Sequence, residues 1–312
     1  MGDNRKKLKA LWGDRSMRHI STSLSILTFS LISSCTSAQP PGITMEMIMR
    51  TLPLEGAPLA EPGPYRVTQE AAFDNPGFIV FRPVDLGAFP QEDKMPLLVW
   101  GAGGCNIDGR SYGGILSTIA SHGFIAMATL PVEPEEGEEA RRNATADDML
   151  NAISWAEAEN ARDGSHLQGK IDVDQISAMG VSCGGFRMAA VAGLDPRVDL
   201  VGILNSGVAD ATELAGLHGP ILLLNGGEVD FMYDTARENF EAINHVPVFL
   251  GARENAGHSA TYPHPGGGEF ANVISDWLMY QFKGDEDAGR TFKGAGCRLC
   301  TNPTWETDAK GL

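Results

Sequence analysis

The stretch Gly180-Val181-Ser182-Cys183-Gly184 decides the fold expected of this chain, because it fits the pattern Gly-x-Ser-x-Gly. An apolar run at residues 176–181 predicts a short buried strand before Ser182, and residues 186–192 predict a helix after it. A strand, a sharp turn and a helix in this order project the serine hydroxyl group outward. The alternative is a glycine-rich turn without a catalytic role.

Outward from this turn, short apolar runs alternate with helical patterns, which is typical of a largely parallel sheet covered by helices on both faces. Strands are expected at residues 65–73, 78–84, 97–100, 124–130, 176–181, 200–204, 221–224 and 246–250, and helices at residues 113–121, 145–161, 186–192, 235–243 and 269–282. Thr145 and Asp148 have the spacing of a capping box at the start of the second helix. The sequence therefore predicts one α/β domain over residues 65–284.

Two further side chains are needed if Ser182 reacts, because a serine hydroxyl group is a weak nucleophile until a base accepts its proton. His258 follows the last predicted strand and is the candidate base, with His264 further along the same loop as the alternative. A carboxylate must orient that histidine. Asp230 follows the preceding strand and is the candidate acid. The alternatives for the acid are Glu228, Asp234 and Asp210.

Negative charge that develops on a substrate oxygen must be met by fixed hydrogen-bond donors. The amide of Cys183 is expected to be one donor, because it begins the helix after Ser182. The other is expected from the loop Gly101-Ala102-Gly103-Gly104-Cys105, with Gly103 or Gly104 as the candidates. The aromatic residues beside these loops are candidates for the pocket wall: Trp100, Tyr112, Phe231 and Tyr233.

The cysteines outside the N-terminal segment are four in number, which favours disulfides in an exported chain: Cys105, Cys183, Cys297 and Cys300. A bridge between Cys105 and Cys183 would hold the two predicted donor loops together. Two buried thiols, or pairing with the other two cysteines, are the alternatives. Cys297 and Cys300 are interpreted as a local staple. A redox pair or half of a zinc site is the alternative, although no second pair of ligands completes a metal site.

Residues 1–35 have the pattern of an export signal, with basic residues before an apolar run at 24–32 that is too short to span a bilayer. Ile32-Ser33-Ser34-Cys35 is similar to a bacterial lipobox, in which Cys35 would be lipidated; cleavage near residues 36–38 is the alternative. Both predict an exported protein, periplasmic or secreted, with a lipid anchor to the cell envelope in the first case. Residues 36–64 are rich in proline and predict a tether or edge segment, and residues 285–312 form a C-terminal tail.

The charge of the chain limits its partners. Residues 1–35 hold six basic and two acidic residues, so their removal takes the net charge from −16 to −20. Such an excess of negative charge argues against nucleic acid and against anionic membrane surfaces as partners. A neutral small molecule is compatible with it.

With its Gly-x-Ser-x-Gly turn, Asp230 and Gly257-His258 in this order over residues 65–282, the chain resembles the α/β-hydrolase superfamily. Within that superfamily it is similar to small exported esterases related to dienelactone hydrolases and polyester hydrolases. The resemblance implies an eight-stranded sheet, no cofactor, and an acyl-enzyme that water resolves. We therefore expect a hydrolase of small or polymer-linked carboxylic esters. The sequence does not predict the number of subunits. An amidase, peptidase or acyltransferase, or a non-catalytic surface-anchored binding protein, is the alternative.

Overall fold

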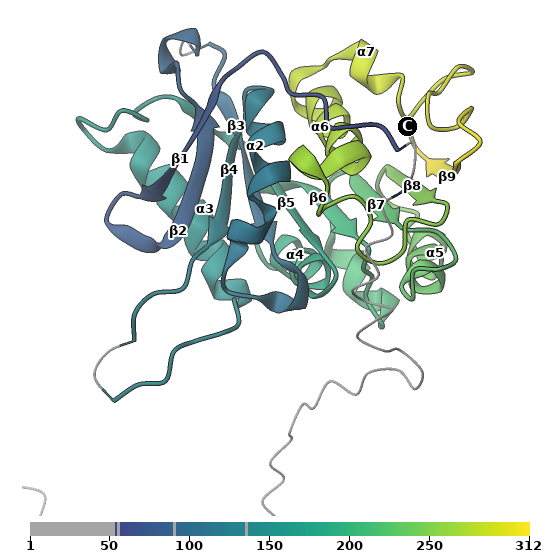
Figure 1. Ribbon diagram of the computed structural model, residues 1–312, viewed down its shortest axis with the longest axis horizontal. Helices are drawn as coiled ribbons and strands as arrows, with labels where there is room; N and C mark the ends of the chain where they lie inside the picture. Colours follow the sequence, from purple (N-terminus) through teal and green to yellow (C-terminus); the bar gives the residue numbers. More distant parts are fainter. Residues whose placement is uncertain (1–53, 55–56, 90–91, 135–136) are drawn as a thin grey trace, which may run out of the picture. The chain divides into compact units, whose positions relative to one another are not determined.

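The computed structural model describes Leu54 and residues 57–89, 92–134 and 137–312. These residues form one sheet in the order β1-β2-β4-β3-β5-β6-β7-β8-β9 (Figure 1). Strands β4, β3, β5, β6, β7 and β8 are mutually parallel, whereas β1 and β2 at one edge and β9 at the other pair antiparallel. The strands are β1 (Val67–Ala72), β2 (Asn75–Pro83), β3 (Met95–Gly101), β4 (Ile125–Thr129), β5 (Ile171–Val181), β6 (Val198–Leu204), β7 (Ile221–Asn225), β8 (Val248–Arg253) and β9 (Trp305–Lys310).

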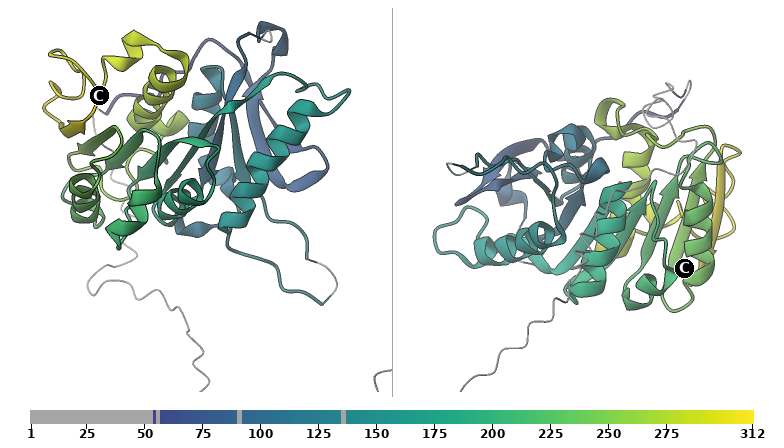
Figure 2. Two further views of the ribbon diagram at one scale, coloured as in Figure 1. Left: turned by 180° about the vertical axis from the view of Figure 1, so that it is seen from behind. Right: turned by 90° about the horizontal axis from the view of Figure 1, so that it is seen from below.

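Helices cover both faces of this sheet, and Figures 1 and 2 show the two faces from opposite sides. One face packs against α2 (Gly113–Ser121) and α6 (Gly268–Lys283), and the other against α3 (Ala146–Ala161), α4 (Cys183–Leu194) and α5 (Tyr233–Ala242). Each face has its own apolar core, because the central strands are buried on both sides. This explains why those strands are continuous apolar runs in the sequence rather than alternating ones.

The α/β class and the order of the elements are as the sequence predicts. Each of the eight expected strands and five expected helices is present, with ends that differ by a few residues. The expected capping box is also present: Asp148 N donates to Thr145 Oγ1 at 3.2 Å, and Thr145 N donates to Asp148 Oδ2 at 2.6 Å.

The sheet has nine strands rather than the eight expected, because the segment after residue 284 belongs to the fold. It contributes the short helix α7 (Glu286–Gly289) and strand β9, which pairs with β8 from Arg253↔Trp305 to Val248↔Lys310. Only Trp305 of the six β9 residues is buried. A strand with one buried side chain has no clear apolar periodicity, so the sequence pattern did not indicate it.

The described residues just before β1 contact two helices, α6 and α2. Glu61 N donates to Asn272 Oδ1 of α6 at 2.7 Å, and Gly63 N donates to Ser121 Oγ of α2 at 2.7 Å. The expected export signal at residues 1–35, including Cys35, lies outside the described residues. Among the residues that the structure describes, no helix combines the length and the apolar character needed to cross a membrane.

Candidate active site

The turn around Ser182 lies where β5 ends and α4 begins, at the carboxyl end of the parallel strands. Ser182 has φ 55° and ψ −126°, a conformation that non-glycine residues rarely adopt. Its N donates to Leu204 O of the neighbouring strand at 2.8 Å. Backbone strain of this kind is concentrated at functional sites.

Glycines on both sides of Ser182 allow the turn to pack against β3. A Cβ atom on Gly184 would lie 2.1 Å from Gly101 O, and one on Gly180 would lie 2.7 Å from the same oxygen. Only glycine therefore fits at these two positions without a shift of the backbone. The motif is thus required by the close approach of α4 to the end of β3.

A line of hydrogen bonds joins Ser182 to the two residues that the sequence selects as its partners. Ser182 Oγ lies 2.8 Å from His258 Nε2, and His258 Nδ1 lies 2.8 Å from Asp230 Oδ1. The side chain of Asp230 is fully buried, and that of His258 is 6% exposed. Phe231 packs against the imidazole ring with its centroid 3.9 Å away. The arrangement can accept a proton from the serine and hold the resulting imidazolium.

Hydrogen bonds keep Asp230 ionised in spite of its burial. Burial alone would raise the pKa of Asp230, but hydrogen bonds from His258 and from two backbone amides hold this pKa below its usual value. Those amides belong to Met232, at 3.1 Å from Oδ1, and Gly226, at 3.1 Å from Oδ2. An ionised carboxylate at this place can stabilise a positive charge on His258.

Asn205 is a further member of the site that the sequence analysis missed. Its Nδ2 donates to Asp230 Oδ2 at 2.7 Å, and its Oδ1 accepts the Tyr262 hydroxyl group at 3.0 Å. Burial raises the pKa of Tyr262 well above its usual value, so this hydroxyl group stays a donor. The available signal was position, because Asn205 directly follows β6, whose carboxyl end faces the site.

The other residues weighed for these roles lie elsewhere. His264 precedes a short 3-10 helix (Pro265–Gly267), and its N donates to Thr261 O. Asp210 caps another 3-10 helix (Ala211–Gly216) by accepting Thr212 N at 3.0 Å. Asp234 is in the first turn of α5, and Glu228 lines a separate surface hollow.

The two loops that were expected to supply donors are joined covalently. Cys105 and Cys183 form a disulfide with 5.1 Å between their Cα atoms. Cys183 is the first residue of α4, and Cys105 ends the loop that contains Gly103 and Gly104. The amide of Gly103 donates to Tyr112 Oη at 3.1 Å. The bridge therefore fixes this loop against the turn that carries Ser182.

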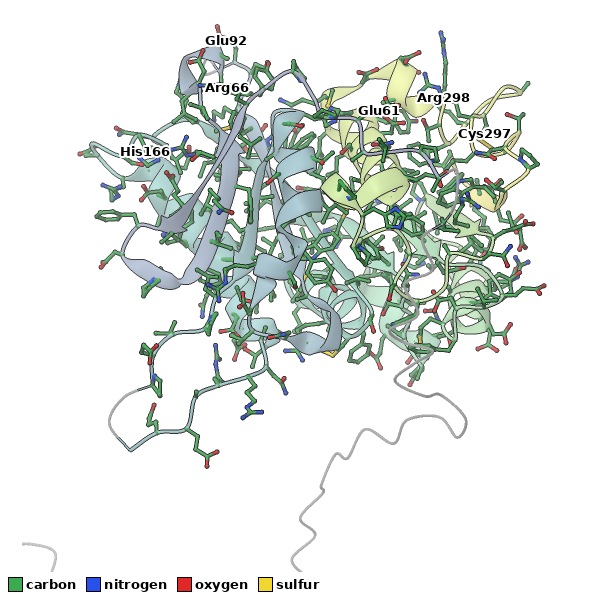
Figure 3. The ribbon with its side chains drawn as sticks, in the orientation of Figure 1. Glu61, Arg66, Glu92, His166, Cys297 and Arg298 are labelled. Carbon is green, nitrogen blue, oxygen red and sulfur yellow. A yellow bond between two sulfur atoms is a disulfide. The ribbon has the colours of Figure 1, made fainter. Side chains whose placement is uncertain are left out.

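The second disulfide joins Cys297 to Cys300 in the C-terminal segment, again with 5.1 Å between Cα atoms. Figure 3 labels Cys297 next to Arg298, whose Nη2 atom contacts Asp287 Oδ2 of α7 at 2.6 Å. This bridge closes a turn of the chain and acts as a local staple. Among the described residues, no group of three or more His, Cys, Asp or Glu side chains is arranged to hold a metal ion.

A pocket of about 550 Å³ opens beside Ser182. Its walls include Gly103, Gly104, Tyr112, Ser182, His258 and Tyr262. None of the described residues that line it is Asp, Glu, Lys or Arg. Apart from His258, the pocket therefore presents neutral polar and apolar groups to a bound molecule.

The aromatic candidates for the pocket wall separate into different roles. Tyr112 lines the pocket, and Phe231 packs against His258. Trp100 is fully buried behind Tyr112, with 5.5 Å between the ring centroids. Tyr233 donates to Glu306 Oε2 of β9 at 2.6 Å.

Neither a scan against protein-family models nor a search of curated proteins finds a match to the chain.

Proposed function

We propose that the protein is a serine hydrolase of the α/β-hydrolase type that cleaves carboxylic esters through an acyl-enzyme. The observation that carries the proposal is the unbroken contact from Asp230 through His258 to Ser182, with 2.8 Å at each step. The strained backbone of Ser182 and the pocket beside it add support. A serine with a merely structural role needs neither an oriented base nor an open pocket.

In the first half of the reaction, Ser182 Oγ forms a bond to the ester carbonyl carbon while its proton passes to His258 Nε2. The carbonyl π electrons move onto the oxygen, and Asp230 stabilises the imidazolium. The amide of Cys183 stands at the start of α4, where it can donate to the developing oxyanion. The intermediate then collapses, and the alcohol leaves with the proton that His258 returns.

In the second half, water replaces the alcohol in the site and the same residues act again. His258 accepts a proton from water, the hydroxide oxygen attacks the acyl carbon, and Ser182 leaves with its proton restored. The chain supplies nucleophile, base and acid from its own side chains. The products are a carboxylic acid and an alcohol.

The lining of the pocket favours uncharged esters. A buried charge on the substrate would need a partner of opposite sign, and none of the described lining residues is permanently charged. We propose small esters, or ester groups on a polymer that can reach the open pocket. Two disulfides are typical of an oxidising compartment, which supports the proposal that the protein is exported.

The test compares the wild-type protein with Ser182→Ala. We expect a fluorophosphonate probe to label the wild-type protein and not the variant, and short p-nitrophenyl esters to be hydrolysed at least ~10³ times faster by the wild type. Removal of a similar hydroxyl group outside the site, in Ser154→Ala on α3, is the matched control and should leave both signals unchanged.

Each outcome separates the candidate functions. Labelling without ester hydrolysis, combined with cleavage of p-nitroanilides, would replace the esterase by an amidase. A folded wild-type protein that neither labels nor hydrolyses would refute the enzyme and leave the binding scaffold.

A further inference from the structure

The Tyr112 side chain has taken up the amide of Gly103, one of the two loop residues expected to supply a donor to the substrate. Gly103 N donates to Tyr112 Oη at 3.1 Å, so this amide already has an acceptor. A Cβ atom on Gly103 would lie 2.6 Å from Tyr112 Oη and 3.5 Å from Val181 Cγ1. The phenol oxygen thus stands close to Gly103, on the side that faces the residue before Ser182.

The phenol has one hydrogen to donate once its oxygen has accepted the Gly103 amide. Within residues 57–89, 92–134 and 137–312, the structure gives this hydroxyl group no protein acceptor, and Gly103 N is its one hydrogen-bond partner. Tyr112 lines the same pocket as Ser182 and His258. A molecule bound in that pocket can therefore accept the Tyr112 hydrogen.

The packing around Tyr112 holds the ring in one place. Its centroid lies 5.5 Å from that of Trp100 and 6.2 Å from that of Tyr262. Burial raises the pKa of Tyr112, although the bond from Gly103 opposes this shift. The hydroxyl group therefore keeps its proton at neutral pH, and a fixed, neutral donor needs little reorganisation during the reaction.

We propose that the Tyr112 hydroxyl group is the second donor to the oxyanion, beside the amide of Cys183. This inference rests on the proposed serine hydrolase function and adds a catalytic residue to it. As Ser182 Oγ bonds to the carbonyl carbon and the π electrons move onto the oxygen, Tyr112 O–H donates a hydrogen bond to that oxygen. The phenol keeps its proton throughout, so the only proton transferred in this step is the one that passes from Ser182 to His258. Gly103 acts behind it as a positioning residue.

The first test is Tyr112→Phe in the full chain, which keeps the ring and removes the hydroxyl group. We expect kcat for p-nitrophenyl acetate to fall about 10²- to 10³-fold, as is typical for loss of one oxyanion donor, with a small change in KM. The affinity of a trifluoromethyl ketone, which forms a tetrahedral adduct with the serine, should fall in parallel. Tyr65→Phe is the matched control and should match the wild type, because Tyr65 packs against Phe89 outside the pocket.

The phenylalanine variant also removes the acceptor of the Gly103 amide, so a second measurement separates donation from loop support. A ring-fluorinated tyrosine at position 112 has a phenol pKa lowered into the assay range. Its phenolate still accepts from Gly103 but has no hydrogen to donate. We expect kcat to fall as pH rises through this ionisation, which the absorbance of the phenolate reports independently. The pH profile of the wild-type protein is the reference, because His258 and Tyr262 line the same pocket in both proteins and only the phenol at position 112 differs.

The outcomes are distinct. An active wild type with Tyr112→Phe within about threefold of it in kcat, or a fluorinated protein whose kcat ignores the phenol ionisation, overturns this inference and leaves the hydrolase intact. A wild type without labelling or hydrolysis overturns the proposed function, and this inference with it. If Tyr112→Phe does not fold, the fluorinated protein alone decides.

Discussion

Asn205 shows, at the scale of single residues, how the candidate site depends on a side chain outside the pocket lining. It is fully buried, and its amide group connects Asp230 to the hydroxyl group of Tyr262 in the pocket wall. Asn205 has φ 45°, a region in which asparagine is enriched among non-glycine residues. Backbone conformation and hydrogen bonding both favour asparagine at this position.

We expect Asn205→Ala to lower the free energy of unfolding by about 1–3 kcal/mol, because it leaves buried polar groups unpaired. In the folded variant, kcat should fall about tenfold or more, since a loss of ~1.4 kcal/mol of transition-state stabilisation has that effect. Urea unfolding and ester hydrolysis measure the two quantities. Asn160→Ala is the control: its Oδ1 accepts Ile171 N at the start of β5, so stability should fall and kcat should not. A wild-type kcat in Asn205→Ala would exclude the positioning role.

The sequence could select Ser182, Asp230 and His258 because each follows a strand of the parallel block, and carboxyl ends of parallel strands meet at one edge. The same rule points to Asn205, but its partner is chosen by tertiary packing. The contact between Gly103 and Tyr112 was hidden for a different reason. A backbone amide has no sequence signature, so the acceptor that it finds is visible only in the folded chain.

At the scale of elements, two boundaries show what limited the prediction. β5 begins at Ile171, five residues before the predicted strand. The prediction missed this first half because it contains Asp172, Asp174 and Gln175 and lacks a continuous apolar run. α4 begins at Cys183, although Gly184 and Gly185 lower helix propensity. Close packing against Gly101 requires glycine at 184, so the tertiary contact outweighs local preference.

The disulfide between Cys105 and Cys183 joins two elements of the site, and its removal should affect both stability and activity. The two cysteines are 78 residues apart, for which the loop-entropy model gives roughly 4–5 kcal/mol, against roughly 2 kcal/mol for the bridge between Cys297 and Cys300. We expect the double variant Cys105→Ser/Cys183→Ser to lose more stability than Cys297→Ser/Cys300→Ser in urea unfolding.

Activity provides the sharper contrast between the two bridges. Only the first double variant should lose kcat in its folded fraction, because only that bridge fixes the Gly103 loop against the turn of Ser182. If the first variant does not fold, limited reduction of the wild-type protein, with alkylation sites mapped by mass, gives the same comparison. If the protein with the Cys105–Cys183 bridge reduced has the same kcat as the protein with the Cys297–Cys300 bridge reduced, the first bridge contributes stability alone.

At the scale of the whole molecule, the alternation of strands and helices could be predicted because burial on both faces leaves long apolar runs. Strand β9 could not, because Trp305 is its one buried side chain. Trp305 is 6% exposed, its ring centroid lies 5.5 Å from that of Phe270, and its Nε1 donates to Glu269 Oε1 at 2.6 Å. Glu269 in turn pairs with Arg253 at the end of β8, at 2.8 Å.

Trp305 should therefore anchor β9 to the rest of the fold. We expect Trp305→Ala to lower the free energy of unfolding by about 3–5 kcal/mol, through the cavity and the lost contact with Glu269. Trp305→Phe keeps an aromatic ring and loses only the indole donor, so about 1–3 kcal/mol is expected. Asp308→Ala is the control on the exposed part of β9, where a surface ion pair contributes at most ~1 kcal/mol. Urea unfolding measures the loss of stability, which should be largest for Trp305→Ala, smaller for Trp305→Phe and smallest for Asp308→Ala. An unfolding midpoint equal to that of the wild type for Trp305→Ala would mean that β9 is not part of the cooperative fold.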